Sequence, residues 1–323
     1  MRSATDIGTM VDLISDTLKQ LITRRLGIPT NPFAANIEID NLSILTARVL
    51  IHQIKSRGTY ENIHDAEFKV FSQFGEDGII QYLIHNVQIE NEAFIEFGVA
   101  DYRESNTRFL LINNNWRGLV IDSGRSNIER IIKDPIYWKF ELQAVHDFVN
   151  RDNIDRIIRE NNFSGDIGLL CIDIDGNDYW VWESIQAVSP TIVIVEYNSI
   201  FGNRRAVTIP YDASFERSRA HYSDLFWGCS LKALCMLAER KDYAFVGSNS
   251  NGNNAFFVRK DKLGNLKTMD IESGYVESRF RESRDLQGRL SYLSGSDRLK
   301  AIGEMQVYDL ESNTLIRIES LAE

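Results

Sequence analysis

The sequence predicts an α/β protein built on a mainly parallel sheet that is covered on both faces, and three observations carry this prediction. From residue 67 onward, short β-branched or aromatic runs alternate with amphipathic stretches, which is the rhythm of βαβ units. The runs at 167–174 and 191–197 are continuously apolar, as expected of strands buried on both faces. Finally, YAFVGS and NAFFVRK flank the Asn-rich turn NSNGN, which favours an antiparallel hairpin at the sheet edge.

Each element follows from its local pattern. Apolar residues at helical spacing, first from Ile7 to Ile22 and again from Ile44 to Ile54, predict an N-terminal helical appendage that packs on the main domain or on a second subunit as a homodimer. The expected strands are 93–98, 118–122, 144–149, 167–174 and 191–197. The expected helices are 76–87, 104–114, 125–133, 152–161, 178–187 and the stretch CSLKALCMLAER. The predicted parts are the appendage (1–66), a main domain (67–262) with an insert (199–228), and a C-terminal extension (263–323).

Composition excludes several classes of protein. The chain has 323 residues, of which 43% are hydrophobic, and a formal net charge of −10, so a disordered chain is excluded and binding to nucleic acid is disfavoured. Three cysteines without CxxC spacing indicate neither a zinc site nor a disulfide framework. Acidic residues interrupt the N-terminus where a secretory signal needs an apolar run, and no stretch is apolar enough for a membrane span. We therefore expect reduced thiols and a cytoplasmic protein.

Polar residues follow the first two predicted strands, at the edge where an open parallel sheet binds ligands. Glu96 and Gly98 end the first strand, and a glycine there lets the backbone approach a ligand closely. Asp122 ends the second strand and is well placed to accept both hydroxyls of a ribose. Each residue also has a structural alternative, a tight turn for Gly98 and a helix cap for Asp122.

A cluster of acids follows the fourth and fifth predicted strands. Asp173, Asp175 and Asp178 come after one strand, and Glu196 and Asn198 come after the next. Uncompensated carboxylates so close together repel, so we expect that one of them is protonated or that a cation joins them. Capping of the next helix by Asp175 is a structural alternative that accounts for only part of the cluster.

Six segments together resemble the FkbM-like family of S-adenosylmethionine-dependent methyltransferases. They are FSQFGEDGII (71–80), FIEFGVADYRESNT (94–107), WRGLVID (116–122), FVNRDNIDRII (148–158), LLCIDIDGNDYWVW (169–182) and NAFFVRKD (254–261). The resemblance extends over residues 70–262. It implies the class I methyltransferase (Rossmann-like) fold, whose sheet has seven strands and an antiparallel last strand.

The resemblance also assigns a cofactor site. It implies that Glu96 and Gly98 contact the methionine part of S-adenosylmethionine, that Asp122 contacts its ribose, and that residues 148–151 lie near its adenine. Ala100 and Asp101 stand where members of the family often have Asp-Gly. The cofactor-binding residues implied in this way are Gln73, Glu96, Gly98, Asn106, Asp122, Phe148, Asn150 and Asp173.

The IDIDGND segment is similar to the corresponding stretch of the metal-dependent, macrocin-type sugar O-methyltransferases. This second likeness implies that Asp173 and Glu196, with Asn198 as a weaker candidate, bind Mg²⁺ or another divalent cation, and that Asp175 is the general base. A cation on a sugar hydroxyl would lower its pKa enough for a carboxylate to remove the proton. Without a metal, His221 is the alternative base.

The expected function is S-adenosylmethionine-dependent O-methylation of a sugar hydroxyl, on a glycan, a nucleotide-linked sugar or a glycosylated natural product. The resemblance implies a role in polysaccharide or natural-product biosynthesis. The insert combines aromatic residues with four arginines (Arg204, Arg205, Arg217 and Arg219), which suit such an acceptor, although packing and pairing with acids explain them equally well. A non-catalytic binding or scaffold subunit stays open as an alternative, whereas a nicotinamide-dependent oxidoreductase lacks its third glycine.

Overall fold

The computed structural model describes residues 32–322. The chain divides into two compact units, Met1–Leu50 and Ile51–Glu323. Helix α2 (Pro32–Arg57) begins in the first unit and ends in the second; it contains the predicted helical stretch from Ile44 to Ile54. The predicted stretch from Ile7 to Ile22 lies outside the described residues. Between residues 32 and 322, no helix is both long and apolar enough to cross a membrane.

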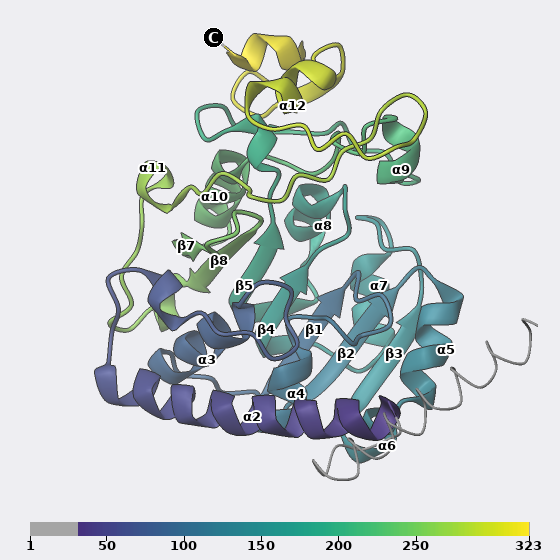
Figure 1. The fold of residues 1–323 in the computed structure, drawn as a ribbon. Helices are drawn as coiled ribbons and strands as arrows, with labels where there is room; N and C mark the ends of the chain where they lie inside the picture. The colour runs from purple at the N-terminus through teal and green to yellow at the C-terminus, as the bar shows by residue number, and fades with distance from the viewer. Residues whose placement is uncertain (1–31, 323) are drawn as a thin grey trace, which may run out of the picture. The chain divides into compact units, whose positions relative to one another are not determined.

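The second unit is built on a seven-stranded sheet with the order β3-β2-β1-β4-β5-β8-β7 (Figure 1). Strands β1 to β5 are parallel to one another, whereas β8 is antiparallel to both of its neighbours. The strands are β1 (Ala93–Phe97), β2 (Arg117–Asp122), β3 (Leu142–His146), β4 (Gly165–Ile172), β5 (Val188–Glu196), β7 (Tyr243–Ser248) and β8 (Asn254–Arg259). The predicted class I methyltransferase fold is therefore confirmed by the number and direction of the strands.

Helices cover both faces of this sheet because successive residues of a strand point to opposite sides. On β1, Phe94 packs in one hydrophobic cluster with α3, α4 and α5, and Ile95 packs in another with α7, α8 and α10. These helices are α3 (Glu76–Asn86), α4 (Arg108–Asn114), α5 (Arg125–Lys133), α7 (Ile154–Glu160), α8 (Asp178–Ser184) and α10 (Leu231–Arg240). The shorter ones are α6 (Ile136–Lys139), α9 (Arg217–Ala220), α11 (Ile271–Gly274) and α12 (Ser296–Ala301), with 3-10 turns η1 (Ile63–Ala66), η2 (Ser199–Phe201), η3 (Lys260–Lys262) and η4 (Ile318–Ala322).

Among the predicted boundaries that differ from the structure, two have a clear local explanation. The helix expected at 104–114 begins only at Arg108, because the Glu96 carboxylate accepts hydrogen bonds from the backbone N–H groups of Asn106 and Thr107 and holds them in a turn. The strand expected at 144–149 is β3 and ends at His146. After it, the chain turns toward α7, and the Asn150 side-chain oxygen accepts the N–H groups of Asp152 and Asn153 just before that helix begins.

The C-terminal extension has a structure that its weak periodicity does not predict. Its strands β9 (Gln306–Asp309) and β10 (Thr314–Arg317) form a small sheet with β6 (Val207–Thr208) of the insert. A separate hydrophobic cluster joins the same two segments and includes Val207, Ile302 and Ile318. In Figure 1 the extension, in yellow, lies beyond the carboxyl ends of β4 and β5. Insert and extension therefore form one layer over that edge of the sheet.

Candidate active site

Two cavities open at the carboxyl ends of the parallel strands. The larger, the wide pocket, has a volume of about 740 Å³, and the smaller, the acidic pocket, has a volume of about 190 Å³. The wide pocket is lined by residues that include Gly98, Ala100, Asp122, Gly124, Asn127, Asp147, Phe148, Ile174 and Phe215. The acidic pocket is lined by residues that include Gln73, Phe74, Glu196, Tyr197, Asn198, Trp227, Asn251, Ser278, Phe280 and Arg298. Both are lined by Asp173, Asp175, Arg217 and Glu282, so the two cavities share a wall.

The backbone after β1 and the acid that ends β2 form one side of the wide pocket. Gly98 has a φ of +73°, and a Cβ at this position would lie 1.7 Å from the carbonyl oxygen of Asp173; only glycine allows β1 and β4 to end so close together. The Asp122 carboxylate accepts hydrogen bonds from the N–H groups of Ala100 (2.8 Å) and Gly124 (2.7 Å) and from the Asn127 amide (2.9 Å). These bonds hold Asp122 in place and leave one of its roughly four acceptor positions for a ligand.

An aromatic ring after β3 forms another side of the wide pocket. Phe148 is 40% exposed although it is large and apolar, and its place on the pocket wall suits a flat ligand that stacks on the ring. Asn150, two residues further on, lines neither cavity, because its carboxamide oxygen accepts the N–H groups of Asp152 and Asn153. The resemblance implies that both residues lie near adenine, but only Phe148 lies on the cavity wall.

The other predicted cofactor residues lie away from the wide pocket. Glu96 is only 4% exposed, burial raises its pKa, and its carboxylate is occupied by Asn106 and Thr107. The Asn106 amide donates to the Cys171 thiol (3.2 Å). Gln73 lines the acidic pocket instead. Of the predicted cofactor set, the structure therefore brings Gly98, Asp122, Phe148 and Asp173 together around the wide pocket.

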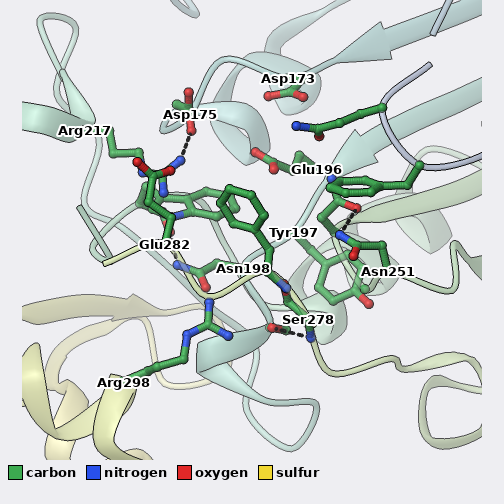
Figure 2. A pocket seen from close by; sticks show the side chains of 17 residues that line it. Asp173, Asp175, Glu196, Tyr197, Asn198, Arg217, Asn251, Ser278, Glu282 and Arg298 are labelled. Atoms are coloured by element: carbon green, nitrogen blue, oxygen red, sulfur yellow. Dashed lines mark hydrogen bonds and ion pairs between the residues drawn. The ribbon is translucent and has the colours of Figure 1, made fainter. Parts of the chain in front are cut away.

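Two buried acids at the ends of neighbouring strands line the acidic pocket. Asp173 follows β4 and Glu196 ends β5, so strand pairing brings them together, and Figure 2 shows both side chains on the same side of the cavity. Burial, and then the negative charge of the neighbouring acids, raises the pKa of both groups well above their ordinary values. Glu196 Oε2 is buried without a hydrogen-bond partner in the structure. This pair therefore favours one bound proton, as repulsion between adjacent carboxylates requires.

The predicted metal ligands do not present a set of free, converging oxygens. The Oδ1 atom of Asn198 accepts the N–H of Ile200 (3.1 Å), and its Nδ2 atom donates to two backbone carbonyls. The Asp175 carboxylate forms an ion pair with Arg217 (2.5 Å), so it is not free to bind a cation together with Asp173 and Glu196. In the described part of the chain, no group of three or more His, Cys, Asp or Glu side chains is arranged to hold a metal ion. The residues as placed thus do not fit a divalent cation, and a proton and Arg217 balance their charge.

Arg217 is the insert arginine that reaches the site. Its guanidinium stacks over the Trp227 ring (5.0 Å), pairs with Asp175, and donates from Nε to the carbonyl of Asp224 (2.7 Å). Two others are used elsewhere, because Arg205 pairs with Asp309 and Arg219 with Glu216. One arginine of the insert thus faces the cavities, one pairs with the buried Asp309, and one pairs with the partly exposed Glu216.

His221, the predicted alternative base, lines neither cavity. Its Nδ1 atom lies 2.7 Å from the Ser223 hydroxyl, and its ring packs on that of Tyr222. Burial lowers its pKa. These contacts describe a histidine that is held within the insert.

Residues of the C-terminal extension complete the acidic pocket, and the sequence pattern does not identify them. Ser278, Phe280, Glu282 and Arg298 all line it. Two hydrogen bonds hold the segment around residues 276–278 against the residues that follow β5. The Ser278 N–H donates to the Ser199 hydroxyl (3.0 Å), and the Tyr197 hydroxyl donates to the Val276 carbonyl (2.7 Å). No periodicity or motif marks these residues in the sequence, because they reach the site only through contacts between distant segments.

Comparison with known proteins finds similarity in structure alone. No family model matches the sequence, and no curated protein is significantly similar to it. Among solved structures, an S-adenosylmethionine-dependent methyltransferase from Clostridium acetobutylicum has 9% identity and a TM-score of 0.36, over 59% of this chain and 91% of that one. An O-methyltransferase from Bacillus cereus in complex with S-adenosylhomocysteine has 11% identity and a TM-score of 0.36, over 75% and 95% of the two chains. At such low values the function has to be argued from the residues of the site.

Proposed function

We propose that this protein is an S-adenosylmethionine-dependent methyltransferase that holds the cofactor in the wide pocket and the methyl acceptor in the acidic pocket. One observation carries the proposal: two cavities at the carboxyl edge of a class I sheet share a wall formed by Asp173, Asp175, Arg217 and Glu282. Group transfer needs two sites whose reacting ends meet, because most of the catalysis comes from alignment of donor and acceptor. The FkbM-like segments support S-adenosylmethionine as the donor.

The wide pocket suits this cofactor in size and chemistry. Its volume of about 740 Å³ lies within the roughly 300–1,000 Å³ that is usual for small-molecule sites. The acceptor position left on Asp122 is available to a ribose hydroxyl, and the Phe148 ring to the adenine face. Gly98 also lines this pocket, so its backbone is available to the methionine part.

The acidic pocket suits methyl transfer to an oxygen. In that reaction the acceptor oxygen attacks the methyl carbon, the carbon–sulfur bond breaks, S-adenosylhomocysteine leaves, and the hydroxyl proton passes to a base. A carboxyl group whose pKa is raised is a stronger base than an ordinary carboxylate, and burial and neighbouring acids give the Asp173–Glu196 pair this property. Asp175, the base implied by the resemblance, is instead held in an ion pair with Arg217. We therefore assign the proton transfer to the pair.

A sugar hydroxyl is the acceptor that the site supports best. Trp227 and Phe280 line the acidic pocket, and aromatic faces suit the apolar side of a sugar ring. Its volume of about 190 Å³ is below the usual range for a whole ligand, so it holds the reacting ring while the rest of the acceptor extends outward. The resemblance to sugar-modifying families supports the same class, in the biosynthesis of a glycan or a glycosylated natural product.

Calorimetry with S-adenosylmethionine and S-adenosylhomocysteine tests the first half of this proposal on the full-length protein. We expect both to bind at one site per chain; absence of binding to either would overturn the proposal. The second half is tested by release of S-adenosylhomocysteine in the presence of neutral sugars, uronic acids and sugar phosphates. Cofactor binding without transfer to any of them would favour the non-catalytic binding subunit.

A further inference from the structure

Arg298 is a buried cation without a partner. It is only 7% exposed, yet its Nε atom has no hydrogen-bond partner, and its guanidinium makes no hydrogen bond or ion pair with any residue that the structure describes. It lines the acidic pocket. In Figure 2 its side chain enters from α12 and points into the cavity, toward the side where Asn198 lies. Buried charges are normally paired with a group of opposite charge. The described residues of the protein do not supply such a negative group to Arg298.

The position of Arg298 is set by the packing around α12. Leu299 and Ile302, which follow it in the chain, pack in the hydrophobic cluster that contains Phe201 and Val207 of the insert. The pairing of β6 with β9 fixes the same two segments to each other. Arg298 is therefore held at the cavity by a structured layer, and the guanidinium is placed before any ligand arrives.

The charges near Arg298 leave room for an anion. Glu277 attracts it and Arg217 repels it, and burial, which is the largest effect, lowers the pKa of Arg298. Glu277 does not come within ion-pairing distance, and Arg217 is already paired with Asp175. Figure 2 shows Asp173 and Glu196 on one side of the cavity and Arg298 on the other. The acidic pocket thus has an acid end, where a hydroxyl can lose its proton, and a separate cationic end.

We infer that Arg298 binds a carboxylate or phosphate group of the methyl acceptor, so that the substrate is an acidic sugar and not a neutral one. This inference rests on the proposed function, because it takes the acidic pocket to be the acceptor site. The guanidinium offers a planar fork of N–H donors that matches the oxygens of a carboxylate or phosphate. A neutral acceptor would leave these donors buried and unpaired, and a site of this kind discriminates strongly against a ligand that lacks the matching group.

Calorimetry on the full-length protein saturated with S-adenosylhomocysteine tests the inference, with D-glucuronate, inorganic phosphate and D-glucose as the probes. We expect glucuronate or phosphate to bind more tightly than glucose, and the stronger of the two identifies the kind of anion. Arg298→Gln should weaken that binding at least about tenfold. Arg317→Gln is the matched control, since Arg317 belongs to the same extension but is exposed and paired with Glu319; it should leave the binding unchanged.

Thermal unfolding separates ligand binding from a structural role. Because no negative group compensates the charge of Arg298, Arg298→Met should leave the midpoint of thermal unfolding unchanged or raise it when no anion is present. The anion should raise the midpoint of the unsubstituted protein but not that of Arg298→Met. A large loss of stability in Arg298→Met, or equal binding of the anion to Arg298→Gln, would overturn the inference. If S-adenosylhomocysteine binds but neither anion does, this inference fails while the proposed function stands. If phosphate or glucuronate binds through Arg298 but the cofactor does not, the anion site stands and the proposed function fails.

Discussion

The wide pocket and the acidic pocket lie side by side but are assembled in different ways. The wide pocket is formed mainly by residues at or just after the carboxyl end of a parallel strand, such as Gly98, Asp122 and Phe148. The acidic pocket takes two acids from the strand ends but depends on Phe280 and Arg298 of the C-terminal extension for its other side. The sheet thus determines where a cofactor binds, and the joined insert and extension determine what else can bind beside it. Changes to residues that line only one of the pockets should therefore leave the other working.

The largest effect should come from Glu196→Gln, which removes a charge of the acid pair but keeps the size of the side chain. We expect turnover to fall about a thousandfold, within the range for loss of a general base, while the affinity for S-adenosylhomocysteine stays unchanged, because Glu196 does not line the wide pocket. Turnover of the native protein should rise with pH as the pair, whose pKa values are raised, loses its proton.

Release of S-adenosylhomocysteine with the most active sugar measures this effect, and Glu183→Gln, which alters an acid paired with Arg240 away from both cavities, is the control. Asp175→Asn should cost less than Glu196→Gln. A larger loss in Asp175→Asn would show instead that Asp175 is the base implied by the sequence.

Asp122→Ala should affect the wide pocket alone. The change removes the ligand-facing oxygen and also the acceptor for Ala100, Gly124 and Asn127, so we expect S-adenosylhomocysteine to bind about 10- to 100-fold more weakly. Binding of phosphate or glucuronate in the acidic pocket should be retained. Calorimetry measures both affinities, and Asp152→Ala, an acid that lines neither cavity, should change neither. Equal weakening in the two pockets would contradict their independence.

Arg205→Ala should act on the join between insert and extension. Arg205 pairs with Asp309, whose side chain is 1% exposed, and removal of one partner leaves that carboxylate buried without a counter-charge. Because Asp309 keeps the N–H groups of Glu311 and Ser312, we expect a loss of about 2 kcal/mol in the free energy of unfolding. The same change should weaken anion binding in the acidic pocket, whereas the affinity for the cofactor should stay unchanged.

Urea denaturation measures this loss. Arg289→Ala, which removes an exposed pair with Asp285, is the control and should cost less than about 1 kcal/mol. A drop in cofactor affinity as large as the drop in anion affinity would show that the extension also supports the wide pocket.

The smallest effect should come from His221→Asn. His221 lines neither cavity, and its ring nitrogen is engaged by Ser223, so turnover should stay within about twofold of the native value, far from the loss expected of a missing base. Steady-state kinetics across pH 6–8 measures it. A loss comparable to that of Glu196→Gln would identify His221 as the base after all.

The part of the site that the sequence predicts is the part that local pattern encodes. Asp122 can be placed because it ends a strand whose apolar run is visible, and parallel strands end at one edge, whereas Phe148 is placed by the resemblance alone. Asp173 and Glu196 are predicted as neighbours for the same reason, although as metal ligands, since the sequence does not show that Asn198 and Asp175 are engaged by other groups. Glu96 is predicted to contact the cofactor, but it does not line the wide pocket. Its carboxylate is instead engaged by the backbone N–H groups of Asn106 and Thr107, in a turn that the sequence pattern does not show.

The sequence by itself determined the alternation of strands and helices, the antiparallel last strand and the acids at the strand ends, because these follow from the period of apolar residues and from neighbours in the chain. Only the tertiary structure decided that Arg298 faces Asp173 and Glu196 across a cavity. That juxtaposition depends on a two-residue strand, β6, pairing with β9 far along the chain, and on hydrophobic contacts between segments of weak periodicity. Such contacts are selected by the whole folded chain, because no single segment is stable enough to specify them alone.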